Sequence, residues 1–216
     1  MQYGIAADKI HVTGLPVHRA FSLNRYLTRQ EARAALDIEE RPTLLLVGGG
    51  EGMGAIDKLA EAVDQAQPGL QKLIVSGRNQ SLKDRLDRYA WQAPTHVFGF
   101  VRNMAQLMRA ADLIVTKAGP STLSEALVCG VPILLSGFVP GQEEGNVRFV
   151  LDHKVGYFLR RPADELGPTL DRLLGDGSTQ LTAMAQRAYA LGRPDAARDA
   201  VQLILRIGVP SEHGVS

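Results

Sequence analysis

Short apolar runs alternate with longer amphipathic segments along most of this chain. Near-continuous apolar runs are typical of strands buried on both faces of a parallel sheet, whereas the segments between them have helical periodicity. We predict strands at residues 43–47, 72–76, 96–98, 113–116, 133–135 and 156–159. We predict helices at residues 28–36, 55–66, 81–89, 104–110, 122–128, 146–152, 162–174, 179–191 and 194–207. This order predicts an α/β fold, a Rossmann-like doubly wound parallel sheet followed by C-terminal helices.

The same pattern divides the chain into three parts. Residues 1–27 are predicted to be an entry segment, residues 28–177 the Rossmann-like domain, and residues 178–216 a set of C-terminal helices. The chain has 216 residues, of which 45% are hydrophobic, so it can bury a core of this size.

Composition excludes several classes of function. The formal net charge is +1 and no run of Lys or Arg exceeds two residues, so we expect no nucleic-acid partner. Cys129 is the single cysteine, which excludes an internal disulfide and a Cys-rich zinc site. No stretch approaches the about 18 apolar residues of a membrane span. We therefore expect a cytoplasmic protein that meets a membrane only at its surface.

The segment 113–130 has the features of a site for a nucleotide diphosphate. A buried strand leads into the turn Gly119-Pro120, and Ser121 or Thr122 is predicted to cap the helix that follows. The unpaired N–H groups and the positive dipole end of such a helix suit a diphosphate. Glu125, about one turn into the helix, is placed to accept hydrogen bonds from ribose hydroxyls.

A polar loop follows the next strand and is expected beside the same edge of the sheet. Its amide and carboxylate side chains, among them Gln142, Glu143 and Asn146, suit sugar hydroxyls. Hydroxyls are neutral and need paired donors and acceptors rather than charge.

Each of these features has a simpler alternative. Thr122 and Glu125 have the spacing of a capping box, in which the carboxylate only satisfies the first amide of the helix. Residues 142–144 could be a solvated first helical turn with acidic side chains that suit the dipole. The occurrence of all these features in one strand–helix–strand–loop unit favours a ligand site.

A glycine-rich loop at residues 48–54 raises a different possibility. Gly50-x-Gly52-x-x-Ala55 fits a relaxed dinucleotide-binding pattern, and Arg78 after the next strand could meet the phosphate of NADP. An NADP-dependent reductase is therefore an alternative, although it leaves residues 119–125 and 142–146 without a role. A second alternative is that the glycines only permit a sharp turn.

Six spaced segments together resemble the C-terminal domain of monogalactosyldiacylglycerol synthases and processive diacylglycerol glucosyltransferases, members of glycosyltransferase family 28. The resemblance covers residues 10–174. The segments are Gly14-Leu15-Pro16-Val17, Gly48 to Gly54, Ser76-Gly77-Arg78-Asn79, Gly99-Phe100-Val101-x-x-Met104, Thr116 to Ala126, and Pro140-Gly141-Gln142-Glu143-x-Gly145-Asn146.

The resemblance implies a GT-B fold in which this domain binds a UDP-hexose donor. The expected contacts of UDP are Phe100, Val101, Gly119, Pro120, Ser121, Thr122 and Glu125. The expected contacts of the transferred hexose are Gln142, Glu143 and Asn146. The residues expected to line the cleft are Gly50, Glu51, Gly52, Met53, Gly54 and Arg78. We expect no cofactor and no metal, since fixed dipoles and cations can stabilise the UDP leaving group and no Asp-x-Asp motif occurs.

The resemblance also implies a partner, because such an enzyme needs an N-terminal acceptor domain that supplies the catalytic base and the contact with the membrane surface. None of the histidines His11, His18, His96, His153 and His213 lies in a motif that activates an acceptor hydroxyl. We therefore expect half of an inverting hexosyltransferase, inactive alone, that joins an acceptor domain in cis or in trans and acts on a lipid, diacylglycerol. A nucleotide-sugar-binding module without catalysis is the alternative within the same fold.

Overall fold

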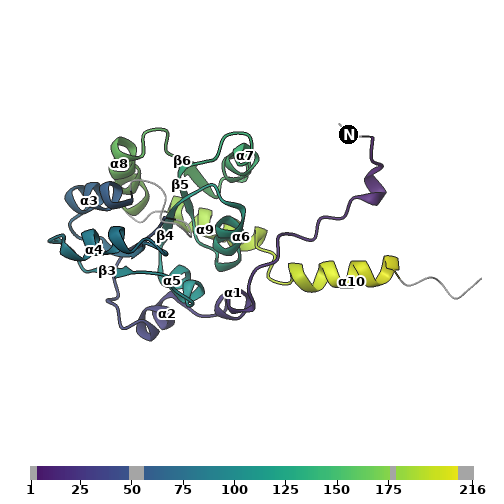
Figure 1. Ribbon diagram of the computed structural model, residues 1–216, viewed down its shortest axis with the longest axis horizontal. Coiled ribbons are helices and arrows are strands. Elements are labelled where there is room, and N and C mark those ends of the chain that lie inside the picture. The colour runs from purple at the N-terminus through teal and green to yellow at the C-terminus, as the bar shows by residue number, and fades with distance from the viewer. Residues whose placement is uncertain (1–3, 49–55, 176–178, 209–216) are drawn as a thin grey trace, which may run out of the picture.

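The computed structural model describes residues 4–48, 56–175 and 179–208. Within them, six parallel strands form one sheet in the order β3-β2-β1-β4-β5-β6. The strands are β1 (Thr43–Val47), β2 (Gln71–Val75), β3 (Thr95–Phe98), β4 (Leu113–Lys117), β5 (Ile133–Gly137) and β6 (Gly156–Phe158). The predicted doubly wound parallel sheet is confirmed (Figure 1).

Helices cover both faces of the sheet. They are α1 (Arg19–Asn24), α2 (Arg29–Ala35), α3 (Ile56–Ala66), α4 (Gln80–Arg88), α5 (Met104–Ala110), α6 (Pro120–Cys129), α7 (Glu144–Asp152), α8 (Pro162–Leu174), α9 (Thr179–Leu191) and α10 (Ala196–Gly208), with a short 3₁₀ helix η1 (Ala7–Lys9). Buried side chains of α1, α2, α5, α6 and α7 pack on one face, and those of α3, α4 and α8 pack on the other.

The central strands explain why the sheet is buried on both sides. Along β1, Leu45 belongs to one core cluster whereas Leu44 and Leu46 belong to the other, and none of the three is exposed. Successive side chains of a strand point to opposite faces, so an unbroken apolar run needs helices on both.

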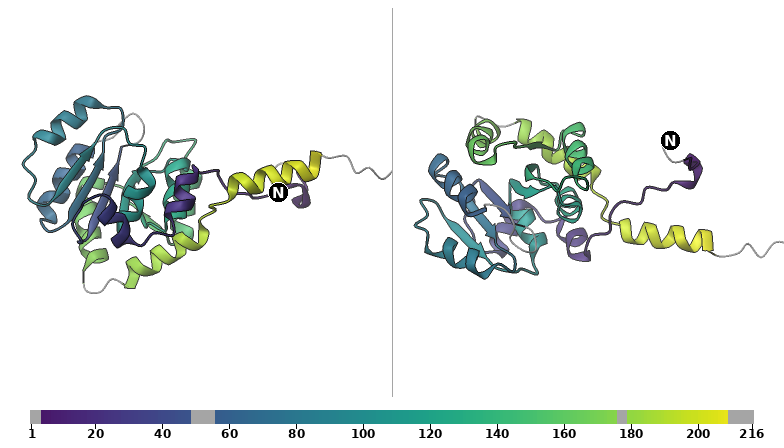
Figure 2. Two further views of the ribbon diagram at one scale, coloured as in Figure 1. Left: turned by 90° about the horizontal axis from the view of Figure 1, so that it is seen from below. Right: turned by 45° about the horizontal axis from the view of Figure 1, so that its top comes forward.

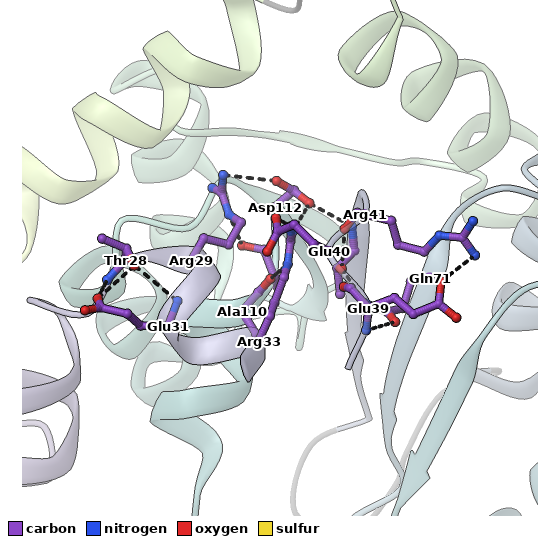
Figure 3. Close-up of polar contacts among 12 residues, drawn as sticks. Thr28, Arg29, Glu31, Arg33, Glu39, Glu40, Arg41, Gln71, Ala110 and Asp112 are labelled. Atoms are coloured by element: carbon purple, nitrogen blue, oxygen red, sulfur yellow. Dashed lines mark hydrogen bonds and ion pairs between the residues drawn. The ribbon is translucent and has the colours of Figure 1, made fainter. Parts of the chain in front are cut away.

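A network of charged side chains closes the amino end of the sheet (Figure 3). Asp112, directly before β4, accepts hydrogen bonds from Arg33 Nη2 and from the backbone N–H of Thr43, both at 2.7 Å. Arg33 in α2 also donates to the carbonyl oxygen of Ala110 at 3.0 Å and pairs with Glu40. The network therefore ties α2 to the starts of β1 and β4.

The carboxyl ends of the strands lie at the opposite edge of the sheet. The chain begins in the centre with β1, moves outward through β2 and β3, and then returns to place β4 on the other side of β1. Such a reversal is the topological switch point at which open α/β sheets bind ligands. Gly48 follows β1 at this point, and Ala118 and Gly119 follow β4.

The last helix, α10, extends away from the sheet on the same side of the molecule as the N-terminal residues (Figures 1 and 2). Residues 10–13 and the α10 residues Asp199, Gln202, Leu203 and Arg206 line a common pocket. Within the described ranges, no helix is long and apolar enough to cross a membrane.

Candidate functional site

Helix α6 begins directly after β4 at the switch point. Gly119 is its N-cap and Pro120 its first residue, so the prediction that Ser121 or Thr122 caps the helix is wrong. Proline favours the first helical position because its φ is already helical and it has no N–H to leave unpaired. Ser121 and Thr122 instead lie in the first turn, where backbone N–H groups have no partner within a helix. No side chain caps this end, so these N–H groups face the edge of the sheet without a side-chain partner.

The other end of α6 is closed by a glycine. Gly130 is the C-cap with φ 69°, a left-handed conformation that glycine adopts without strain. The backbone N–H of Val131 then bonds to the carbonyl oxygen of Ala126 at 2.9 Å. Both ends of the helix are therefore determined by backbone geometry.

Glu125 lies in the middle of α6 and is partly buried. Burial raises the pKa of its carboxyl group to about 7. The capping-box alternative is wrong for this helix, because Thr122 is already inside it and no side-chain cap is formed. A carboxyl group in this state can donate to or accept from a hydroxyl, and its desolvation is not explained by helix capping.

The loop between β5 and α7 is organised by two carboxylates. Glu143 is the N-cap residue of α7, and its Oε2 accepts a hydrogen bond from the backbone N–H of Val139 at 2.8 Å. Glu144 Oε1 accepts from the N–H of Gly141 at 2.6 Å, and this bond lowers the pKa of Glu144. Gln142, directly before Glu143 in the chain, is exposed.

Two contacts join this loop to the β4–α6 turn. Asn146 Nδ2 donates to the carbonyl oxygen of Ala118 at 2.8 Å. Lys117 Nζ lies 3.3 Å from Oε1 of Glu143, whose side chain is only 9% exposed. The structure therefore brings Glu143 and Asn146 together with the start of α6. It also adds Lys117, to which the sequence interpretation assigns no role.

The loops after β2 and β3 form a second group. The guanidinium carbon of Arg78 lies 5.4 Å from the centre of the Phe100 ring, a cation–π contact. Phe100 is 62% exposed, whereas Val101 packs against the core cluster that contains Leu123 of α6. The exposed ring offers a flat apolar surface at the same edge of the sheet.

The two groups lie on either side of β1, which separates β2 from β4 in the sheet. The five residues predicted to line the cleft in the loop after β1, Gly50, Glu51, Gly52, Met53 and Gly54, lie outside the described residues. The predicted roles of all these side chains toward a ligand stay predictions.

A cavity of about 430 Å³ lies beside α6 and α7. Its walls are largely apolar, with Leu15, Leu123, Leu127 and Phe149 among them, and it shares Asn146 with the site described above. An apolar cavity does not suit a diphosphate, so the edge of the sheet is the better candidate for an anionic ligand.

Imidazole and acidic side chains do not gather in the described ranges. His18 caps α1, with Nδ1 accepting from the N–H of Ala20 at 3.2 Å, and His153 stacks on Phe149. No group of three or more His, Cys, Asp or Glu side chains that could hold a metal ion occurs among the residues described.

Comparison with known proteins agrees with this geometry. The chain is 38% identical over 207 residues to monogalactosyldiacylglycerol synthase 3, chloroplastic, of Arabidopsis thaliana. The aligned region covers 92% of this chain and 44% of that protein. It is 38% identical over 201 residues to the monogalactosyldiacylglycerol synthase of Spinacia oleracea, with 89% and 38% covered. The chain thus spans less than half the length of these relatives.

Solved structures show the same fold. MurG of Acinetobacter baumannii superposes with a TM-score of 0.63 at 23% identity over 85% of this chain and 55% of that one. HepE of Anabaena, solved in complex with UDP-glucose, superposes with a TM-score of 0.64 at 20% identity over 96% and 59%. The predicted Rossmann-like half of a GT-B fold is therefore confirmed.

A profile of the glycosyltransferase family 28 C-terminal domain matches residues 43–196, from the first strand of the sheet to the start of α10. With most of its length matched and relatives this similar, the chain belongs to glycosyltransferase family 28.

Proposed function

We propose that this chain is the donor-binding half of an inverting hexosyltransferase that takes a hexose from a UDP-hexose and transfers it to a lipid, diacylglycerol. Membership of family 28 supports the transferase class, and the names of the relatives support the lipid acceptor.

The observation that carries the proposal is that helix α6 has both an uncapped N-terminus and the partly buried carboxyl group of Glu125. The first turn of α6 presents backbone N–H groups that no side chain caps, and a partly buried carboxyl group with a raised pKa lies one turn further on. A nucleoside diphosphate carries both complementary groups, anionic phosphates and ribose hydroxyls. Phe100 offers its exposed ring to the base, and Gln142 and its neighbours extend toward the sugar.

In this proposal the residues of the chain bind and orient the donor. The dipole of α6 stabilises negative charge as the bond between the anomeric carbon and the diphosphate breaks, so that a fixed dipole replaces a metal ion. The acceptor hydroxyl attacks from the opposite face of the sugar, and its proton passes to a base on another domain.

That other domain is an acceptor domain, joined in cis or in trans. The chain corresponds to 37–45% of the length of these relatives, which leaves room for a second domain of comparable size. Helix α10 supports an interface with it, since Val201, Ile204, Leu205 and Ile207 are 55–70% exposed along one helix. Exposed apolar side chains that gather in this way mark an interaction surface. The acceptor domain would place the protein on the cytoplasmic surface of a membrane.

Calorimetry with the isolated chain tests the donor. We expect binding of UDP, UDP-galactose and UDP-glucose, and no binding of NADPH. Binding of NADPH without UDP would favour the reductase, for which the glycine-rich loop and Arg78 are the only motivation.

A transfer assay tests the enzyme. We expect no glycosylation of diacylglycerol vesicles by the chain alone at saturating UDP-hexose, because a base and a second wall against water are both needed. Activity should appear when an acceptor domain of a homologous synthase is fused or added. If UDP-hexose binds but no acceptor domain restores transfer, the non-catalytic binding module is the better description.

A further inference from the structure

Lys117 is the last residue of β4, two positions before the N-cap of α6. Its side chain is 38% exposed, and its only ion pair among the described residues is with Glu143, at 3.3 Å. The preceding four residues of the strand are buried. A cation that emerges at the end of a buried strand, at the topological switch point, is well placed for an anionic ligand.

Glu143 differs from Lys117 in having little contact with solvent. Its side chain is 9% exposed, and its second oxygen is already engaged by the N–H of Val139 at 2.8 Å. Oε1, which faces Lys117, is therefore the oxygen that can change its partner without breaking the loop. Lys117 forms no other side-chain hydrogen bond among the described residues, so it can exchange Glu143 for a ligand without losing a further partner.

Both side chains adjoin the N-terminus of α6. A Cβ atom placed on Gly119 would lie 3.8 Å from Oε1 of Glu143 and 3.8 Å from Cε of Lys117. A diphosphate at the free N–H groups of Ser121 and Thr122 would thus meet the ammonium group as well. It would also meet the negative charge of Glu143, which opposes its binding unless that charge finds another partner.

We propose that Lys117 contacts the diphosphate of the donor by giving up its pair with Glu143, which releases Oε1 of Glu143 to accept a hydrogen bond from a hydroxyl of the transferred hexose. This inference rests on the proposed function, since it presumes a UDP-hexose at the site. The exchange makes the complete donor a better ligand than UDP, because only the hexose provides a new partner for the released carboxylate.

The first test is Lys117→Gln, which removes the charge and keeps much of the side-chain length. Calorimetry with UDP should show about tenfold weaker binding, since a charge-assisted contact is lost. Binding of uridine, measured by saturation-transfer NMR, should be unchanged because uridine has no phosphate. Lys117→Arg keeps the charge and should retain UDP affinity within about threefold, which also shows that the position tolerates substitution.

Lys154→Gln is the matched control, because Lys154 is an exposed lysine that follows the end of α7 by two residues and belongs to neither of the loops at the site. It changes the net charge equally and should leave UDP affinity unaltered. Equal losses in the two glutamine variants, or unchanged UDP affinity in Lys117→Gln, would overturn the role of Lys117. Equal losses for UDP and uridine in Lys117→Gln would do the same, since they would indicate general damage to the site.

Glu143→Gln tests the exchange itself. The amide oxygen can still accept from Val139, while the charge that competes for Lys117 is gone. UDP should bind two- to threefold more tightly, and the preference for UDP-hexose over UDP should fall. Weaker UDP binding would show that the pair holds Lys117 in its binding position, and would overturn the exchange. Failure of the unaltered chain to bind UDP would instead reject the proposed function, and this inference with it.

Discussion

The two ends of the same sheet differ in whether their polar groups have partners within the protein. At the amino end, Asp112 accepts hydrogen bonds from Arg33 and Thr43 and pairs with Arg29. The guanidinium group of Arg33 also donates to the carbonyl oxygen of Ala110 and pairs with Glu40 (Figure 3). At the carboxyl end, the first turn of α6 has no side-chain cap and Glu125 is buried at the expense of its ionised form.

The difference separates stability from function. Every parallel strand contributes its carboxyl end to one edge, so a ligand there can contact several loops at once, while the amino edge is free to be closed. Polar groups that lack partners lower the stability of the ligand-free protein. A ligand that forms hydrogen bonds with these groups therefore binds more tightly. Substitutions at the amino end should therefore change stability alone, and substitutions at the carboxyl end should change binding first.

Lys72→Met should have the largest effect. Lys72 in β2 pairs with Asp64 at 2.6 Å, both side chains are 0% exposed, and Asp64 also accepts from the N–H of Gln92. Removing the cation leaves a buried carboxylate without its partner, so we expect the free energy of unfolding to fall by about 3–5 kcal/mol in urea denaturation. UDP affinity of the folded fraction should not change.

The double variant Lys72→Met/Asp64→Leu is the control for that prediction. It removes both charges, and we expect it to recover most of the lost stability. A loss of UDP affinity in Lys72→Met that exceeds the unfolded fraction would contradict the separation of the two ends.

Much of the fold could be predicted because apolar periodicity is a local signal. The sequence predicts β1, α5, α8 and α9 with the bounds that the structure has. It does not predict α1, because only Phe21 of its six residues is buried and so no apolar stripe marks it. A long-range bond from Ser22 Oγ to the carbonyl oxygen of Pro194, at 2.7 Å, connects this helix to the chain before α10.

The site could be predicted only as far as its chemistry is local. The strand, the turn and Glu125 follow from adjacent residues, but the start of α6 depends on Pro120, whose preference for the first helical position prevails over the capping preference of Ser121 and Thr122. Lys117 directly follows the strand predicted at residues 113–116, and its partner Glu143 lies 26 residues later. Only the packed structure brings the two together.

Glu125→Gln should change the free energy of UDP binding more than it changes the free energy of unfolding. A carboxylate that accepts from ribose hydroxyls forms charge-assisted bonds, and their loss should raise the dissociation constant by the equivalent of about 1.5–3 kcal/mol. Calorimetry measures this, with Glu61→Gln on α3 as a matched control that should bind UDP normally. Unchanged UDP affinity would remove Glu125 from the site.

The same variant should change how stability depends on pH. The pKa of Glu125 is raised from 4.5 to about 7 by burial, so ionisation is harder in the folded chain than in the unfolded chain. The contribution of the protonated Glu125 to the free energy of unfolding is fully present below pH 4.5, and it is lost as the pH rises through about 7. At pH 8, Glu125→Gln should therefore be more stable than the unaltered chain by about 1–2 kcal/mol, a figure reduced for partial exposure. Urea denaturation at pH 4 and pH 8 measures the difference, which should vanish at the lower pH.

Gln142→Ala should have the smallest effect and the most selective one. Gln142 is exposed, and its backbone N–H bonds to the carbonyl oxygen of Val139 at 3.2 Å, so the loop keeps its shape when the side chain is shortened. The lost contact is a neutral hydrogen bond to a sugar hydroxyl, worth about 0.5–1.5 kcal/mol. Affinity for UDP-galactose or UDP-glucose should fall by that amount toward the affinity for UDP, while UDP itself binds as before. Equal losses for UDP and for the UDP-hexose would place this loop on the nucleotide, and the carboxyl edge of the sheet would then be divided differently between base and sugar.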